Sequence, residues 1–156
     1  MHHDETSDYL AISRLQAAYA DTVTRRAWGE LAELFRPDCG IALDLRDGTT
    51  HDFTGGAEIG AFIAAAIGSF DFFEFAILNS VVDTSRSWEG FATGRLYVTE
   101  IRRDATTGSF SQTFGLYRDE YVSDDGRWRF GARRYASLAR HTADGGTTVA
   151  FEFPAP

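Results

Sequence analysis

The hydrophobic pattern of this chain changes its period once, near residue 70, and that change constrains the fold more than any other feature. Before it, apolar residues recur every three to four positions over 7–25, 28–35 and 57–67, which is typical of amphipathic helices. After it, residues 71–84, 88–102, 109–123 and 127–141 show the two-residue alternation of strands, with short breaks that suit hairpins. The order predicts an α+β domain in which three helices, the first capped by Ser7 or Thr6, cover an antiparallel meander.

The predicted strands are too long to lie in a flat sheet. Ten or more residues at ~3.3 Å per residue span about 33 Å, and a sheet of that length twists and coils. A further hairpin is expected within residues 40–53, around a turn at Asp47 and Gly48. The curvature closes a cavity under the helices, and 13 phenylalanines are more than a core this small needs. We therefore expect an aromatic-lined pocket for one largely apolar small molecule.

Composition excludes several classes of function. A formal net charge of −8 disfavours binding to nucleic acid. No residue is lysine, which excludes Schiff-base catalysis and P-loop phosphate binding. The single cysteine, Cys39, has no partner for a disulfide, and no Cys or His spacing suits a transition metal. We expect no cofactor.

The chain is expected to be one domain over 1–156, with a core at about 7–140 and a tail at 144–156. Residues 147–153 of this tail are a candidate extra strand. The start has no basic and apolar leader, and no run approaches the ~20 apolar residues of a membrane span. We expect a cytoplasmic protein that does not bind membranes.

Several segments, in their order and spacing, resemble the SnoaL-like family of the nuclear transport factor two-like superfamily over about residues 7–140. They are ISRLQAAYA at 12–20, RRAWGEL and LFRPD within 25–38, FTGG at 53–56, YRDEY at 117–121 and GRWRF at 126–130. The resemblance implies a cone-shaped α+β fold with a pocket that works without a cofactor. Relatives include steroid delta-isomerase, scytalone dehydratase and polyketide cyclases, whereas other members only bind or scaffold, so the fold leaves the reaction open.

The resemblance also implies an acid–base dyad that this chain lacks. The catalytic Asp and His of the dehydratase and dehydrochlorinase branches fall on Thr24 and Phe75, and a phenylalanine cannot transfer a proton. Asn79, the Asn that follows that His in the family, is retained. On a regular strand Asn79 shares a face with Phe73 and Phe75, so we expect it to point inward. There it either donates to a substrate carbonyl or satisfies neighbouring backbone.

Four other residues are candidate catalytic groups under this resemblance. Tyr19 matches the isomerase tyrosine that donates to a developing enolate oxygen, although a tyrosine on such a helix is more often part of the core. The isomerase base aligns with Leu43, so its neighbour Asp44 faces the pocket only if a bulge turns it inward. Arg133 matches an arginine that binds a leaving group, or else forms a structural cross-strand pair with Asp119.

The first functional hypothesis is a cofactor-independent isomerase, cyclase or dehydratase that acts on a polyketide- or terpenoid-like compound. Its catalytic candidates are Tyr19, Asp44, Asp119 and Arg133, and its expected binding residues are Phe73, Phe75, Asn79, Tyr117, Tyr135, His51 and Trp28. An exposed hairpin position is the alternative for His51.

Two alternatives remain open at this stage. The chain is either a non-catalytic ligand-binding or assembly protein, or the small subunit of an aromatic-ring dioxygenase. In the dioxygenase case a larger partner subunit would carry all the chemistry. For the chain itself we expect a homodimer or small homo-oligomer through the outward sheet face, where four aromatic residues are expected: Trp88, Phe91, Tyr97 and Phe114.

Overall fold

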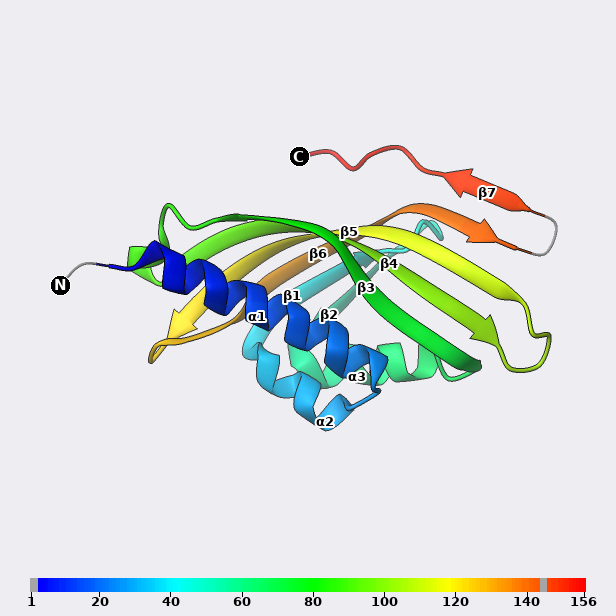
Figure 1. The fold of residues 1–156 in the computed structure, drawn as a ribbon, viewed down its shortest axis with the longest axis horizontal. Coiled ribbons are helices and arrows are strands. Elements are labelled where there is room, and N and C mark those ends of the chain that lie inside the picture. Colours follow the sequence, from blue (N-terminus) through cyan, green and yellow to red (C-terminus); the bar gives the residue numbers. More distant parts are fainter. Residues whose placement is uncertain (1–2, 144–145) are drawn as a thin grey trace.

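A computed structural model describes residues 3–143 and 146–156, and it shows helices on one face of a long curved sheet (Figure 1). The helical layer consists of α1 (Glu5–Thr24), α2 (Trp28–Leu31), the short 3-10 turn η1 (Ala32–Leu34) and α3 (Gly55–Ala66); a second 3-10 turn, η2 (Ser87–Glu89), joins two strands. These helices lie on the concave side, whereas the C-terminal segment runs along the opposite side. The predicted α+β class with three helices is confirmed.

The sheet contains seven strands: β1 (Phe35–Asp44), β2 (Thr50–Thr54), β3 (Phe70–Asp83), β4 (Phe91–Asp104), β5 (Phe110–Asp124), β6 (Arg127–Thr142) and β7 (Thr147–Ala150). Their order is β2-β1-β6-β5-β4-β3, and β7 pairs with β6. All pairs are antiparallel except β1 with β6. The meander is confirmed as β3 to β6, and the extra strand ends at Ala150, short of the predicted 153.

Helix α1 packs its apolar stripe against the concave face of the sheet. Ile12, Leu15, Tyr19 and Val23 are buried and follow the three-to-four spacing that the sequence shows. The cap differs from the prediction of Ser7 or Thr6, because the carboxylate of Asp4 accepts hydrogen bonds from both of their backbone N–H groups at 3.1 and 3.2 Å.

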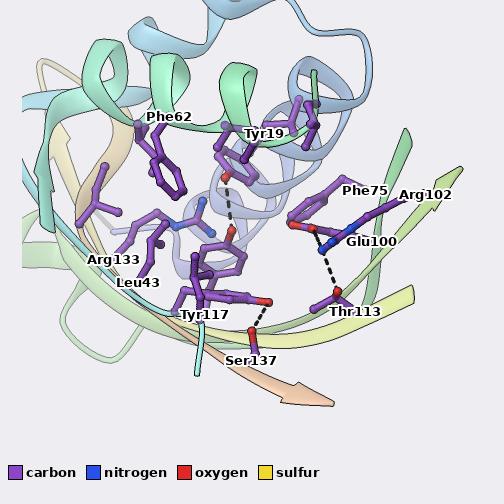
Figure 2. Close-up of a pocket in the computed structure, with 18 of the residues that line it drawn as sticks. Tyr19, Leu43, Phe62, Phe75, Glu100, Arg102, Thr113, Tyr117, Arg133 and Ser137 are labelled. Carbon is purple, nitrogen blue, oxygen red and sulfur yellow. Dashed lines mark hydrogen bonds and ion pairs between the residues drawn. The ribbon is translucent and has the colours of Figure 1, made fainter. Parts of the chain in front are cut away.

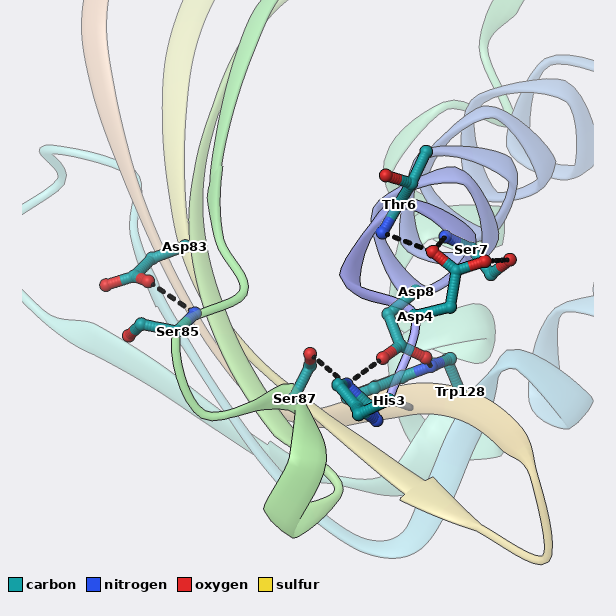
Figure 3. Close-up of polar contacts among 9 residues, drawn as sticks. All are labelled: His3, Asp4, Thr6, Ser7, Asp8, Asp83, Ser85, Ser87 and Trp128. Atoms are coloured by element: carbon teal, nitrogen blue, oxygen red, sulfur yellow. Dashed lines mark hydrogen bonds and ion pairs between the residues drawn. The ribbon is translucent and has the colours of Figure 1, made fainter. Parts of the chain in front are cut away.

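A group of polar contacts fixes the start of α1 to the end of the sheet (Figure 3). Asp8 accepts a hydrogen bond of 2.9 Å from the indole N–H of Trp128, at the beginning of β6. His3 Nε2 lies 2.6 Å from Asp8 and 2.7 Å from the hydroxyl of Ser87, in the connection between β3 and β4. These contacts hold α1 across the sheet, so its last turns lie above the cavity. No helix in the described ranges is long and apolar enough to cross a membrane.

Candidate functional site

A largely enclosed cavity of about 190 Å3 lies between the helices and the concave face of the sheet (Figure 2). Helix α3 contributes Ile59, Phe62 and Ile63, which lie on one helical face at spacings of three and four residues. Strand β1 contributes Ile41 and Leu43, which alternate with outward residues. Most of the wall is therefore apolar, as the sequence predicts.

A buried ion pair fixes the main polar group of this wall. Arg133 on β6 and Asp119 on β5 are cross-strand partners, with Nε to Oδ1 at 2.7 Å and Nη2 to Oδ2 at 3.2 Å. Asp119 also accepts a hydrogen bond from Tyr121, whose hydroxyl accepts one from Gln16; the Gln16 carbonyl in turn accepts from Ser80. This chain holds Asp119 behind Arg133, so the carboxylate itself does not line the cavity.

The guanidinium group of Arg133 is enclosed by three aromatic rings. Its central carbon lies 4.3 Å from the centroid of Tyr19, 3.8 Å from that of Tyr117 and 4.1 Å from that of Phe130. Burial alone would lower the pKa of Arg133, but the Asp119 carboxylate and the tyrosines raise it above its ordinary value. Arg133 is thus a permanent cation at the cavity wall, and its Nη1 has no hydrogen-bond partner among the described residues.

Two neutral tyrosines stand beside this cation. The hydroxyls of Tyr19 and Tyr117 are 3.4 Å apart, and both residues line the cavity (Figure 2). Burial raises the pKa of each phenol, so both keep their protons at neutral pH. One shared hydrogen occupies the gap between them, and this leaves one O–H free to donate to a ligand.

A second polar group lies at the other end of the cavity. Arg102 Nη2 donates to Glu100 Oε2 and to Thr113 Oγ1, each at 2.7 Å, and Arg140 lies nearby on β6. Glu100, Thr113 and Arg140 form one cross-strand row. None of these four residues was among the site residues predicted from the sequence. The sequence pattern that could have predicted this group is the alternation on β4, where the inward residues Leu96 and Val98 are followed at the same spacing by Glu100 and Arg102.

Five of the predicted site residues line the cavity: Tyr19, Phe75, Tyr117, Arg133 and Tyr135. Phe73 is buried in the core beside it, and Trp28 is half-buried at the core's edge. His51 lies in β2, outside the cavity, where its Nε2 is 2.7 Å from a carboxylate oxygen of Asp47. The side chain of Asp44 is 44% exposed and does not line the cavity. Leu43 and Leu45 take the inward positions on either side of it.

The expected inward orientation of Asn79 is wrong. The pairing of β3 with β4 shifts its register between Ile77 and Asn79, which places an extra residue, Leu78, in the strand. A one-residue insertion reverses the faces that follow it, so Asn79 is exposed and Ser80 reaches Gln16 beneath α1.

The two dyad positions do lie together. The hydroxyl of Thr24 accepts a 3.0 Å hydrogen bond from the backbone N–H of Phe75. The structure therefore brings this helix end and this strand into contact, but with side chains that supply neither a base nor an acid. Within the described ranges, no three His, Cys, Asp or Glu side chains are grouped to hold a metal ion.

The fold and its cavity define a cone-shaped α+β domain with a small-molecule pocket between helices and sheet. The family model of the SnoaL-like domain matches residues 4–134, and the chain belongs to this family.

Solved structures share the fold at low sequence identity. A candidate scytalone dehydratase from Novosphingobium aromaticivorans is 23% identical, with a TM-score of 0.71, and the match covers 96% of this chain and 91% of that one. A hexachlorocyclohexane dehydrochlorinase, LinA-type3 from Novosphingobium barchaimii, is 17% identical, with a TM-score of 0.76 and coverage of 96% and 97%. No curated protein sequence matches the chain.

Proposed function

We propose that this protein is a cofactor-independent enzyme of the isomerase or dehydratase type that acts on a hydrophobic carbonyl compound. One observation carries the proposal: Arg133, Tyr19 and Tyr117 present hydrogen-bond donors together at one end of a mostly apolar cavity. The named activities of the dehydratase and dehydrochlorinase neighbours, both of which remove a small group from a substrate, support this class.

The donors suit an oxygen on which negative charge develops. When a carbonyl compound loses a proton from the adjacent carbon, the electron pair of the broken C–H bond moves onto the oxygen as an enolate. A cation and a neutral phenol that are already in place stabilise this charge without rearrangement, and a mostly apolar cavity strengthens the interaction. Arg133 is held by Asp119, and Tyr19 by its neighbouring rings, so the donors are pre-positioned.

Glu100 is the proposed proton acceptor. It is the one carboxylate among the residues that line the cavity, whereas Asp44 faces solvent and Asp119 is enclosed behind Arg133. Its ion pair with Arg102 fixes the orientation of the carboxylate. Glu100 would take the proton from carbon and return it to a second carbon in an isomerisation, while loss of a leaving group from the enolate would complete an elimination.

A polyketide- or terpenoid-like substrate and a homodimer through the outer sheet face remain part of the proposal. Trp88, which is 67% exposed in the turn η2 at one end of the sheet, supports a partner surface at that end.

Deuterium exchange tests the proposed proton transfer without knowledge of the natural substrate. The protein is incubated in D2O with cyclic aromatic ketones such as 1-tetralone, 2-tetralone and 1-indanone, and deuterium uptake next to the carbonyl is followed by mass spectrometry. We expect catalysed uptake for at least one ketone, a rate lowered about 10²–10³-fold in Tyr19→Phe or Tyr117→Phe, and no uptake in Glu100→Gln.

The matched control is Glu74→Gln, which makes the same change at an exposed position on β3 and should keep the wild-type rate. If ketones bind but none exchanges, the protein is a ligand-binding member of the family and the proposal fails. If Glu100→Gln exchanges normally while Asp44→Asn does not, the base is Asp44, one of the catalytic candidates from the sequence, and the assignment of Glu100 fails.

A further inference from the structure

We propose that the ligand of this cavity is a hydrophobic acid of one or two rings, with its carbonyl oxygen at Arg133 and its carboxylate at Arg102 and Arg140. This inference rests on the proposed function, because it names the substrate class for the same cavity. Three observations support it: two unpaired donors, their separate positions along the cavity and the charge of the wall.

The first observation is a pair of buried donors without partners. Among the described residues, Nη1 of Arg133 and Nε of Arg102 are buried nitrogen atoms that make no hydrogen bond. Both residues line the cavity, and Arg133 is only 1% exposed. Buried guanidinium N–H groups are rarely left unpaired, since their desolvation then has no compensation. A ligand with two separate acceptor groups would satisfy both donors.

The second observation is the spacing of these donors along the cavity. The guanidinium of Arg133 lies over the ring of Tyr117, and that of Arg102 contacts the hydroxyl of Thr113. Tyr117 and Thr113 are four residues apart on β5, so their backbone positions are separated by roughly 13 Å along the strand, and the two guanidinium groups reach the cavity from different parts of it. The wall between them contains Tyr135 and is faced by the apolar side of α3. A flat ring system with an oxygen group at each end matches this arrangement.

The cavity volume limits the number of rings. At about 190 Å3 it is slightly larger than the engineered cavity of about 150 Å3 that holds one benzene. One ring or two fused rings fit this space, and a four-ring steroid does not. The inferred substrate is therefore smaller than the largest polyketide compounds that the family resemblance allows.

The third observation is the charge of the wall. Asp119 balances Arg133, and Glu100 balances Arg102. Arg140 has no carboxylate within ion-pair distance in the described part of the chain, and its guanidinium lies 5.2 Å from the centroid of the Phe151 ring. The cavity and its immediate partners thus carry one excess positive charge, although the whole protein has a formal charge of −8. A local cation in an acidic protein favours an anionic ligand and disfavours its neutral analogue.

The test compares an acid with its ester. Binding of 6-acetyl-2-naphthoate and of its methyl ester to the full chain is measured by isothermal titration calorimetry at low and moderate salt. We expect the acid to bind at least tenfold more tightly, with a preference that shrinks as salt rises. Arg140→Gln should reduce the affinity for the acid about tenfold and leave that for the ester unchanged. Arg134→Gln, at an exposed position on the same strand, is the matched control and should change neither.

The two proposals can fail separately. Tighter binding of the acid without any deuterium exchange supports the ligand class and contradicts the enzyme. Exchange of neutral ketones together with equal affinity for acid and ester supports the enzyme and overturns the ligand class. Because the comparison of acid and ester uses the wild-type protein, it holds even if Arg140→Gln fails to fold.

Discussion

Removing the carboxylate of Asp119 should destabilise the protein far more than its single ion pair suggests. The side chains of Arg133 and Asp119 are 1% and 0% exposed, so Asp119→Ala leaves a cation buried without its partner. Arginine cannot lose its proton under these conditions. Breaking a buried pair from one side typically costs about 3–5 kcal/mol, a large part of the roughly 5–15 kcal/mol that stabilises a small domain.

The reverse change, Arg133→Met, should cost less and should depend on pH. Burial raises the pKa of Asp119, and the opposing effect of Arg133 is absent in this variant. The folded protein then binds a proton that the unfolded chain has already lost above a pKa of about 3.9. The contribution of this proton to the free energy of unfolding is therefore complete below that pH. The free energy of unfolding then falls as the pH rises, by up to about 1.4 kcal/mol per pH unit. The double variant Asp119→Leu/Arg133→Met, which removes both charges, should lie near the wild type.

Urea unfolding followed by circular dichroism at pH 4.5 and pH 7.5 measures these differences. With a slope of about 2 kcal/mol per M, Asp119→Ala should lower the midpoint by roughly 1.5–2.5 M at both pH values. Asp71→Ala is the control, because its pair with Arg103 is more than 40% exposed and contributes at most about 1 kcal/mol. Two results would show that the buried pair does not act in this way: Asp119→Ala is no less stable than this control, or the double variant is as unstable as Asp119→Ala.

Three further outcomes follow from the packing. A Cβ on Gly115 would lie 2.1 Å from the Tyr135 ring, so Gly115→Ala should lower the free energy of unfolding in urea by about 1–3 kcal/mol and weaken ligand binding. An unchanged ligand affinity would contradict the placement of Tyr135 in the cavity wall. Burial raises the pKa of Cys39 to about 12, so the native thiol should not react with a disulfide reagent at pH 8, and rapid reaction would show that it is accessible. Burial raises the pKa of four tyrosines, so stability should fall once the pH exceeds about 10, where the unfolded phenols ionise. The four residues are Tyr19, Tyr117, Tyr121 and Tyr135. Absorbance at 295 nm should show that their phenols ionise only as the protein unfolds, and ionisation in the native state would refute their burial.

The elements of the fold are predictable from the sequence because they depend on local patterns. The switch of period near residue 70 defines both layers, and the long strands imply the curvature. The position of Tyr19 follows in the same way, since it belongs to the apolar stripe of α1. Its contact with Arg133 does not follow from a local pattern, because the two residues are far apart in sequence and meet only in the folded protein.

The errors in the site have specific physical causes. A bulge at Leu78 reverses the face of Asn79, and a bulge leaves no reliable mark in the sequence. Glu100 and Arg102 went unrecognised because charged residues near a strand end usually face solvent. Here the cavity extends to that end, where Ala66 of α3 and Phe70 of β3 also line it, so both charged residues face the cavity. Which of the acidic side chains reaches the cavity thus depends on how the layers overlap.

A crystal structure of the complex with 6-acetyl-2-naphthoate is the most direct test of the central claim, which is that this cavity binds a hydrophobic molecule by its polar group, through Arg133 and the tyrosines. We expect the ring system to lie between α3 and the sheet, with the ketone oxygen within about 3.2 Å of Arg133 Nη1 or of the Tyr19 or Tyr117 hydroxyl. A ligand bound on the opposite face of the sheet, beneath the C-terminal segment and with no contact to Arg133, would contradict it.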